Sequence, residues 1–72
     1  MNLKKGMKLH FISSDRNEII EKGSSDPNMG IIRTDNQEYS TDFIHRWLYN
    51  GFVKLYDKSG KEIIVKQPEY LS

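Results

Sequence analysis

Cysteine is missing from this 72-residue sequence. Its absence excludes a disulfide framework, a thiolate zinc site and a cysteine nucleophile. A chain without cysteine agrees with a reducing compartment, so we expect the protein in the cytoplasm. No apolar run approaches the roughly 18 residues that a membrane-spanning helix needs. The basic start MNLKKGMKLHF lacks a long apolar region and a small-residue cleavage site, so we expect neither membrane insertion nor a signal peptide.

An excess of one charge is missing as well. Eleven basic and ten acidic residues leave a formal net charge of +1 at pH 7, whereas proteins that bind polyanions in bulk usually show a clear basic excess. Eight isoleucines and eight aromatic residues supply β-forming bulk. We therefore expect one folded domain over residues 1–72, with residues 1–6 as a lead-in and residues 67–72 as a tail.

The motifs that usually mark catalysis are absent too. The sequence has two histidines, His10 and His45, and neither lies in an HExxH motif. It has no GxSxG motif, and its loop GSSDPNMG lacks the lysine and the following helix of a phosphate-binding loop. We expect both histidines at the surface or the core edge, and Glu18 and Glu21 on the solvated side of a strand. The predicted protein is a non-enzyme without a metal or cofactor.

Hydrophobic alternation and turn residues mark four short strands in the first half of the chain. We predict these strands at residues 7–12, 17–22, 30–34 and 38–40. The segments SSDRN and DNQ supply turns between them. The longest loop, residues 23–30, contains two glycines and a proline, which disfavour regular structure.

The period of the pattern changes after residue 40. Apolar residues then recur at helical spacing, which predicts a helix at about residues 41–50 with one apolar face turned inward. The residues on this face are Phe43, Ile44, Trp47 and Leu48. We expect Ser40 or Thr41 to cap the first turn, and Gly51 to end the helix in the left-handed conformation.

Residues 52–66 have the pattern of a β-hairpin that turns at Lys58-Ser59-Gly60, with Gly60 left-handed. In this register Leu55 faces Ile63, and a slip of one residue would mix the two faces. The inner face then comprises Val53, Leu55, Ile63 and Val65. The outer face comprises Phe52, Lys54, Tyr56, Glu62, Ile64 and Lys66.

The resulting order ββββαββ, with short connections, favours an α+β, β-rich fold. Neighbouring strands usually pair, and a curled antiparallel sheet plugged by one helix buries these faces most simply. We predict a small SH3-like or OB-like, partly open antiparallel barrel. An edge strand that pairs with its own copy would make a homodimer, so monomer and homodimer both stay open.

The first predicted function is the binding of a host protein. Exposed tyrosine and arginine side chains often carry the binding energy of protein interfaces. We expect the partner surface to contain Arg46, Tyr49, Lys54 and Tyr56, with the loop at residues 23–30 contributing. Tyr39 and Tyr70 are also expected to be exposed.

The alternative function is nucleic-acid binding through the outer hairpin face. Between Arg46 and Lys66 there are five basic residues against two acidic ones. Aromatic platforms beside lysines can stack bases and neutralise phosphates. The predicted nucleic-acid residues are Phe52, Lys54, Tyr56 and Lys66.

In composition the chain is similar to small accessory proteins of phages and mobile elements in AT-rich bacteria. The similarity consists of short length, lack of cysteine and richness in Lys, Ile and Asn, and it covers the whole chain. It implies an inhibitor or regulator that acts by stoichiometric binding, often to a host defence or replication protein. It assigns no functional residue.

Overall fold

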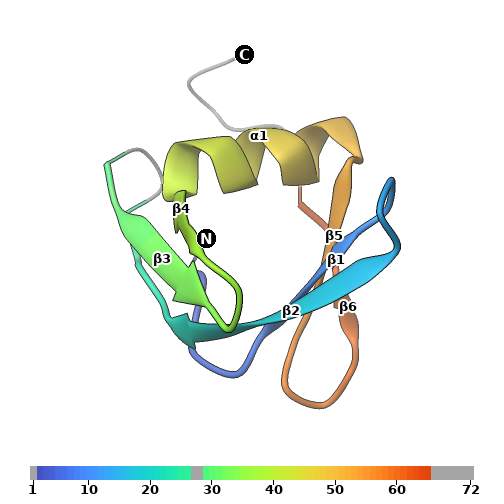
Figure 1. Cartoon of the computed structure of the whole chain (residues 1–72), viewed down its shortest axis with the longest axis horizontal. Helices are drawn as coiled ribbons and strands as arrows, with labels where there is room; N and C mark the ends of the chain where they lie inside the picture. The colour runs from blue at the N-terminus through green and yellow to red at the C-terminus, as the bar shows by residue number, and fades with distance from the viewer. Residues whose placement is uncertain (1, 27–28, 66–72) are drawn as a thin grey trace.

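The computed structural model describes residues 2–26 and 29–65. In this part of the chain four strands precede one helix and two strands follow it (Figure 1). The elements are β1 (Lys8–Phe11), β2 (Arg16–Lys22), β3 (Ile31–Thr34), β4 (Glu38–Ser40), α1 (Thr41–Asn50), β5 (Val53–Tyr56) and β6 (Glu62–Ile63). The strands form one antiparallel sheet in the order β4-β3-β2-β1-β5-β6.

The sheet curls because β5 returns to pair with β1, after β1 to β4 have paired in succession. Its shape is compatible with a small, partly open barrel. Helix α1 connects β4 to β5, packs against both strands, and lies across the open side of the curled sheet (Figure 1). The helix therefore covers the side of the core that hydrogen-bonded strands leave open. It is too short and too polar to cross a membrane, and no other helix occurs among the described residues.

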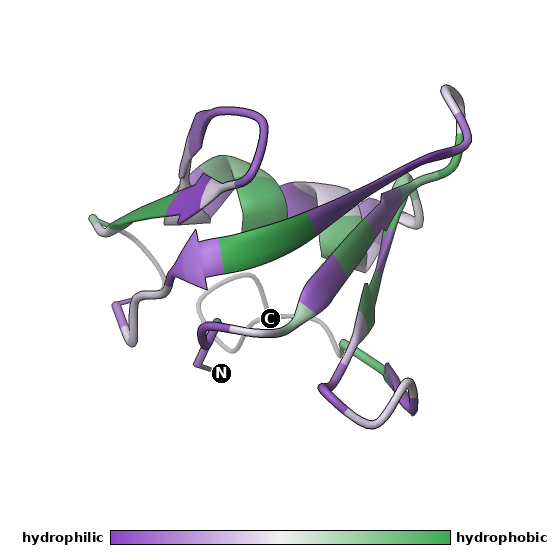
Figure 2. Ribbon diagram, turned by 60° about the horizontal axis from the view of Figure 1, so that its bottom comes forward, coloured by the Kyte–Doolittle hydropathy of each residue, from purple (hydrophilic) through white to green (hydrophobic). Residues whose placement is uncertain are grey.

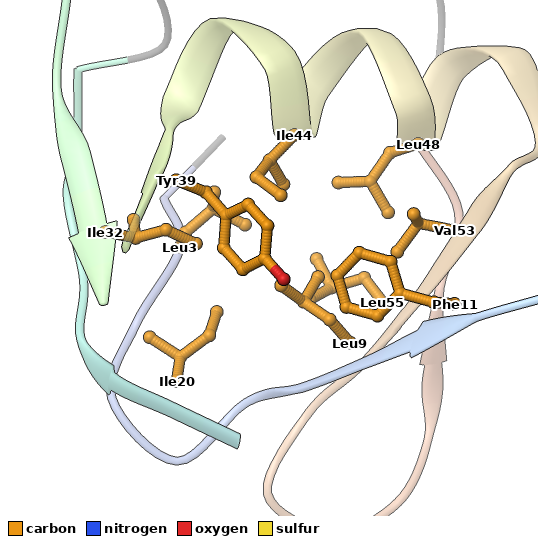
Figure 3. Packing of buried hydrophobic residues seen from close by; sticks show 10 residues of the cluster. All are labelled: Leu3, Leu9, Phe11, Ile20, Ile32, Tyr39, Ile44, Leu48, Val53 and Leu55. Atoms are coloured by element: carbon orange, nitrogen blue, oxygen red, sulfur yellow. The ribbon is translucent and has the colours of Figure 1, made fainter. Parts of the chain in front are cut away.

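Hydrophobic alternation fills the inside of this curl, as expected from the two-residue period of a strand. The middle of β2 is hydrophobic and its ends are hydrophilic (Figure 2). The buried apolar side chains meet between the sheet and α1 (Figure 3). They are Leu3, Leu9, Phe11, Ile20, Ile32, Tyr39, Ile44, Leu48, Val53 and Leu55.

Residues 2–6 belong to the fold, which corrects their expected role as a lead-in. Leu3 is fully buried in the core. Its backbone exchanges hydrogen bonds with Ser24 at 3.1 and 2.8 Å, forming an isolated antiparallel bridge. Leu3 was missed because it stands alone between polar residues, without any periodic pattern. The predicted tail at residues 67–72 lies outside the described residues.

The predicted helix bounds are confirmed, but its buried face is different. The residues facing the core are Thr41, Ile44, His45 and Leu48. Phe43, expected inside, is 54% exposed, and Trp47 lies half-buried at the edge of the core. The prediction centred the buried face on the large aromatic residues Phe43 and Trp47. Helical spacing shows that an apolar face exists, but it does not fix which residues lie at the centre of that face.

The start of the helix also differs from the prediction. Ser40 makes no side-chain capping bond. The hydroxyl of Thr41 instead accepts from Gly30 N at 3.1 Å and lies 3.1 Å from Gly30 O, so it joins the helix to the end of the long loop. The end of the helix is as predicted, because Gly51 has a φ of 84° in the left-handed region.

The register of the last hairpin is confirmed. Leu55 pairs with Ile63, and Asp57 N donates to Lys61 O at 2.9 Å. Gly60 has the predicted left-handed φ, 90°. Val53 and Leu55 are buried, whereas Ile64 on the other face is exposed. The two faces of this hairpin are therefore sorted as the sequence predicts.

Glu18 corrects the expectation of a solvated glutamate. It points inward from β2 and is 1% exposed. Its carboxylate accepts hydrogen bonds from Thr34 Oγ1 at 2.7 Å, Tyr39 Oη at 2.9 Å and Asn36 Nδ2 at 3.2 Å. Arg16 Nε donates at 2.8 Å and supplies the opposite charge. A buried carboxylate needs such partners, and this one ties β2 to the β3–β4 hairpin.

His45 and Tyr39 are also more buried than expected. His45 lies on the inner face of α1, where its Nδ1–H donates to Thr41 O at 2.7 Å. Its Nε2 has no hydrogen-bond partner among the residues that the structure describes. Tyr39, expected at the surface, points into the core (Figure 3). Its hydroxyl donates to Glu18 Oε1 at 2.9 Å. His10 is half-buried on the outer face of β1, in agreement with the prediction.

Candidate binding surface at one end of the barrel

An apolar hollow lies where the end of β1, the C-terminus of α1 and the start of β5 meet. Its volume is about 380 Å³. The lining residues are Phe11, Ile12, Ser13, Trp47, Gly51, Phe52 and Val53, none of them charged. We call this hollow the apolar groove. Phe52 is 63% exposed beside it, so a large apolar side chain is presented to solvent next to a concave apolar surface.

Local backbone geometry builds this groove. The left-handed Gly51 turns the chain sharply after α1, and Phe52 N then donates to Trp47 O at 2.9 Å. Ile12 N donates to Phe52 O at 3.2 Å, which brings the β1–β2 turn beside the start of β5 (Figure 1). The start of the β1–β2 turn is therefore fixed beside the junction of α1 with β5, around one hollow.

Aromatic rings continue from the core to the groove. Trp47 meets Phe11 edge-on with ring centres 6.2 Å apart, and it meets Tyr39 edge-on at 6.1 Å. On its other side Phe43 lies 6.0 Å away and carries the aromatic surface outward. Such ring pairs pack favourably. Trp47 is thus held by buried rings while part of it stays open to solvent.

A second surface adjoins the groove along the outer sides of β1 and β5. Lys8 is paired with Tyr56, and His10 is paired with Lys54. Beyond them Lys4, Lys5 and Lys58 line a hollow of about 470 Å³ between the chain before β1 and the β5–β6 turn. We call the five lysines of this surface, Lys4, Lys5, Lys8, Lys54 and Lys58, the lysine face.

The lysine face lacks counter-ions from the described chain, because none of its lysines forms an ion pair with another described residue. The ion pairs of the described chain engage its three arginines instead, together with His10. The arginine pairs join Arg16 to Glu18, Arg33 to Glu21 and Arg46 to Asp42, and His10 Nε2 makes a contact with Asp15 Oδ1 at 3.5 Å. Lys8 Nζ lies 4.8 Å above the Tyr56 ring, in a cation–π contact that leaves the ammonium charge in place.

Three carboxylates lie near this surface. Asp57 Oδ1 accepts from the Ser59 hydroxyl at 2.6 Å, Ser59 N at 2.9 Å and Lys61 N at 3.0 Å, so it is engaged in the turn. The hydroxyl of Ser59, followed by the backbone amide of Lys61, lowers the pKa of Asp57 below its ordinary value. Glu62 is paired with Tyr56. Asp15 lies 3.5 Å from His10 Nε2. Five lysines thus exceed the carboxylates available to them.

The four predicted partner-binding residues do not form one surface. Arg46 and Tyr49 lie on the exposed side of α1, where Arg46 Nη2 contacts Asp42 at 3.2 Å. Lys54 and Tyr56 lie on the outer side of β5, whereas the inner side of β5 packs towards α1. The two pairs therefore face away from each other across the core.

The described part of the loop at residues 23–30, which is 23–26 and 29–30, also lies apart from the groove. It follows the C-terminal end of β2, and the β1–β2 turn precedes the other end. Seven residues of strand separate the two by roughly 23 Å.

The predicted nucleic-acid residues are closer together. Lys54 and Tyr56 alternate along one side of β5, Phe52 directly precedes the strand, and Phe52 and Lys54 are exposed. Tyr56 is half-buried, and Lys8 covers one face of its ring. Lys66 lies outside the described residues. Sequence reasoning missed Ile12, whose place beside Phe52 depends on the pairing of β1 with β5, and it missed Lys8 for the same reason.

Among the described residues no cluster of His, Asp and Glu is arranged to hold a metal ion. Comparison with protein-family models, with curated proteins and with solved structures finds no match to this chain. The groove and the lysine face therefore have to be interpreted from their own chemistry.

Proposed function

We propose that this chain is a non-catalytic module that binds a partner protein and holds an apolar side chain of that partner in the apolar groove. One observation carries the proposal: exposed Ile12 and Phe52 and half-buried Trp47, from the β1–β2 turn and the junction of α1 with β5, converge on an uncharged hollow. Isolated exposed hydrophobic residues are ordinary, but several around one concavity mark binding sites. Tryptophan and phenylalanine at such places bury much area with little loss of side-chain freedom.

The mode of action follows from the size of the module. A domain of this size can offer about 800 Å² of surface, as a standard interface requires. By occupying a partner one to one, it would inhibit or regulate that partner without chemistry of its own. This agrees with the compositional similarity to phage and mobile-element accessory proteins, and we place the module in the cytoplasm with a host protein as its target.

We also propose that the barrel is SH3-like rather than OB-like. An OB barrel has Greek-key connections. Here β1 to β4 pair in succession, β5 returns to β1, and α1 fills the connection before β5. This arrangement places the apolar groove beside the β1–β2 turn, where a rigid sheet supports it.

Site-specific photo-crosslinking tests the proposed function. A benzoylphenylalanine at position 52 places the reactive group at the groove, and the same residue at position 31 is a matched control. Ile31 is 60% exposed on β3, on an edge hairpin away from the groove. In cells that naturally contain the protein, we expect a crosslinked host protein from position 52 and not from position 31.

The crosslinked product also decides between the alternatives. A product digested by nuclease would support the second candidate function, nucleic-acid binding, which the unpaired charges of the lysine face favour. A product of twice the chain mass would make the groove a homodimer interface. No product at position 52, or equal products at both positions, would contradict the proposal.

A further inference from the structure

The apolar groove and the lysine face are parts of one continuous row. Along the outer sides of β1 and β5, every second residue points outward. At the groove Ile12 N donates to Phe52 O just beyond the paired residues of β1 and β5, and the outward cross-strand pairs that follow are His10–Lys54 and Lys8–Tyr56. The hollow lined by Lys4, Lys5 and Lys58 follows next. One end of the row is therefore apolar, and lysines are prominent along the rest of it.

The spacing of this row matches an extended chain. Successive outward pairs are two residues apart, which is about 6.7 Å along a strand. An extended partner segment repeats its own side chains at the same interval. A side chain seated in the groove therefore places its second and fourth neighbours over Lys54 and Lys8 in turn.

The charge of the row selects the chemistry of the partner. Lys8 and Lys54 have no ion-pair partner among the described residues. Asp57 and Glu62 also lie near the row, but neither forms an ion pair with a lysine among the described residues, and two carboxylates do not balance the five lysines of the lysine face. Carboxylates on the partner would complement the remaining positive charge and speed association.

We infer that the partner segment is an extended peptide with one large apolar anchor and acidic side chains at the second and fourth positions from it. The anchor fills the apolar groove, and the carboxylates lie over Lys54 and Lys8. This inference rests on the proposed function and adds the chemical class of the partner. Single-stranded nucleic acid fits less well, because the groove is uncharged, Lys8 covers one Tyr56 face, and the three arginines are engaged.

Selection from a library of random peptides tests the inference. Peptides of about a dozen residues are long enough to span the whole row. We expect the selected peptides to share a Trp, Phe or Leu anchor, with Asp or Glu enriched at the second and fourth positions. An oligothymidylate of roughly 20 nucleotides, measured by fluorescence anisotropy at low and high salt, serves as the nucleic-acid arm.

Variants of the protein test whether the apolar anchor of the peptide binds in the groove and whether its acidic side chains bind at Lys8 and Lys54. Phe52→Ala should weaken binding by about tenfold or more, because it removes the groove wall. The double variant Lys8→Glu with Lys54→Glu should bind the acidic peptides about tenfold more weakly than the wild type does. Peptides that carry lysine instead of the acidic residues should bind the double variant more tightly than the acidic peptides do. Lys22→Glu, on the exposed end of β2, is the matched control and should change neither affinity.

Three results would overturn the inference. If the selected peptides share an anchor but show no enrichment of Asp or Glu, the inference that the partner segment is acidic is wrong, and the proposed function is unaffected. An absence of selected peptides would also remove it, whereas the proposed function is judged separately by the crosslink at position 52. Oligothymidylate binding that is tighter than any peptide and falls steeply with salt would replace the peptide by nucleic acid.

Discussion

The two sides of this curled sheet differ in how charged side chains are compensated. On the inner side of β2, Glu18 is buried and every partner it needs is supplied by the chain itself. On the outer side of β1 and β5, Lys8 and Lys54 keep their charge without an ion-pair partner among the described residues. A satisfied buried network serves the fold. Unpaired charge beside exposed aromatic rings is available to another molecule.

The largest expected effect is in the buried network. Glu18→Ala leaves the hydroxyls of Thr34 and Tyr39 without their acceptor and Arg16 without its counter-charge. We expect a loss of about 3–5 kcal/mol in the free energy of unfolding, as for other broken buried pairs. Urea unfolding followed by circular dichroism measures it. Glu21→Ala, which removes the exposed pair with Arg33, should cost only about 0–1 kcal/mol; equal losses would show that Glu18 is not buried.

Trp47 packs partly against the core and lines the apolar groove with the rest of its ring. A fully buried ring would cost roughly 3–5 kcal/mol on truncation to alanine. Because Trp47 is half-buried and keeps one side at the groove, we expect Trp47→Ala to cost about 2–3 kcal/mol. The urea midpoint and slope of the variant give this value. A cost near zero would place the ring outside the core, and complete unfolding would place it fully inside.

Phe52 should behave as a surface residue in stability measurements. Phe52→Ala removes a ring that is 63% exposed, so we expect the free energy of unfolding to change by no more than about 0.5 kcal/mol. Thermal unfolding of the variant beside the wild type is sufficient. A loss above about 1.5 kcal/mol would mean that the ring is part of the core and that the groove is closed in solution.

The smallest expected effect is the pH dependence contributed by Asp57. Its pKa is lowered in the folded chain, chiefly by the Ser59 hydroxyl. The stabilisation is therefore present above the ordinary pKa of aspartate and is lost as the pH falls through the lowered value. The difference in the free energy of unfolding between the wild type and Asp57→Asn should be largest at neutral pH and should disappear in acid. A difference that grows in acid would have the wrong sign.

The sequence allowed the repeating elements to be predicted, because their periodicity is local. The bounds of α1 and the register of β5 with β6 could be predicted from spacing and from Gly51 and Gly60. Features that depend on distant partners could not. Glu18 looked like a solvated strand residue because Thr34 and Tyr39 are far away in sequence.

In the candidate site, too, the contacts between segments that are distant in sequence could not be predicted. Phe52 and Lys54 could be picked out because exposed aromatic and basic residues alternate on a predicted strand. Ile12 and Lys8 could not, because only the pairing of β1 with β5 brings them beside those residues. Arg46 and Tyr49 were grouped with Lys54 by closeness in sequence, although the core lies between them.

Amide chemical-shift mapping with the tightest-binding selected peptide tests the central claim most directly, because it reports on both sides of the barrel at once. The account predicts shifts at Ile12, Phe52 and Lys54 and at the indole N–H of Trp47, with little change at Thr34 and Asn36 beside the Glu18 network. Shifts concentrated at Thr34 and Asn36, with an unchanged Trp47 indole, would contradict it.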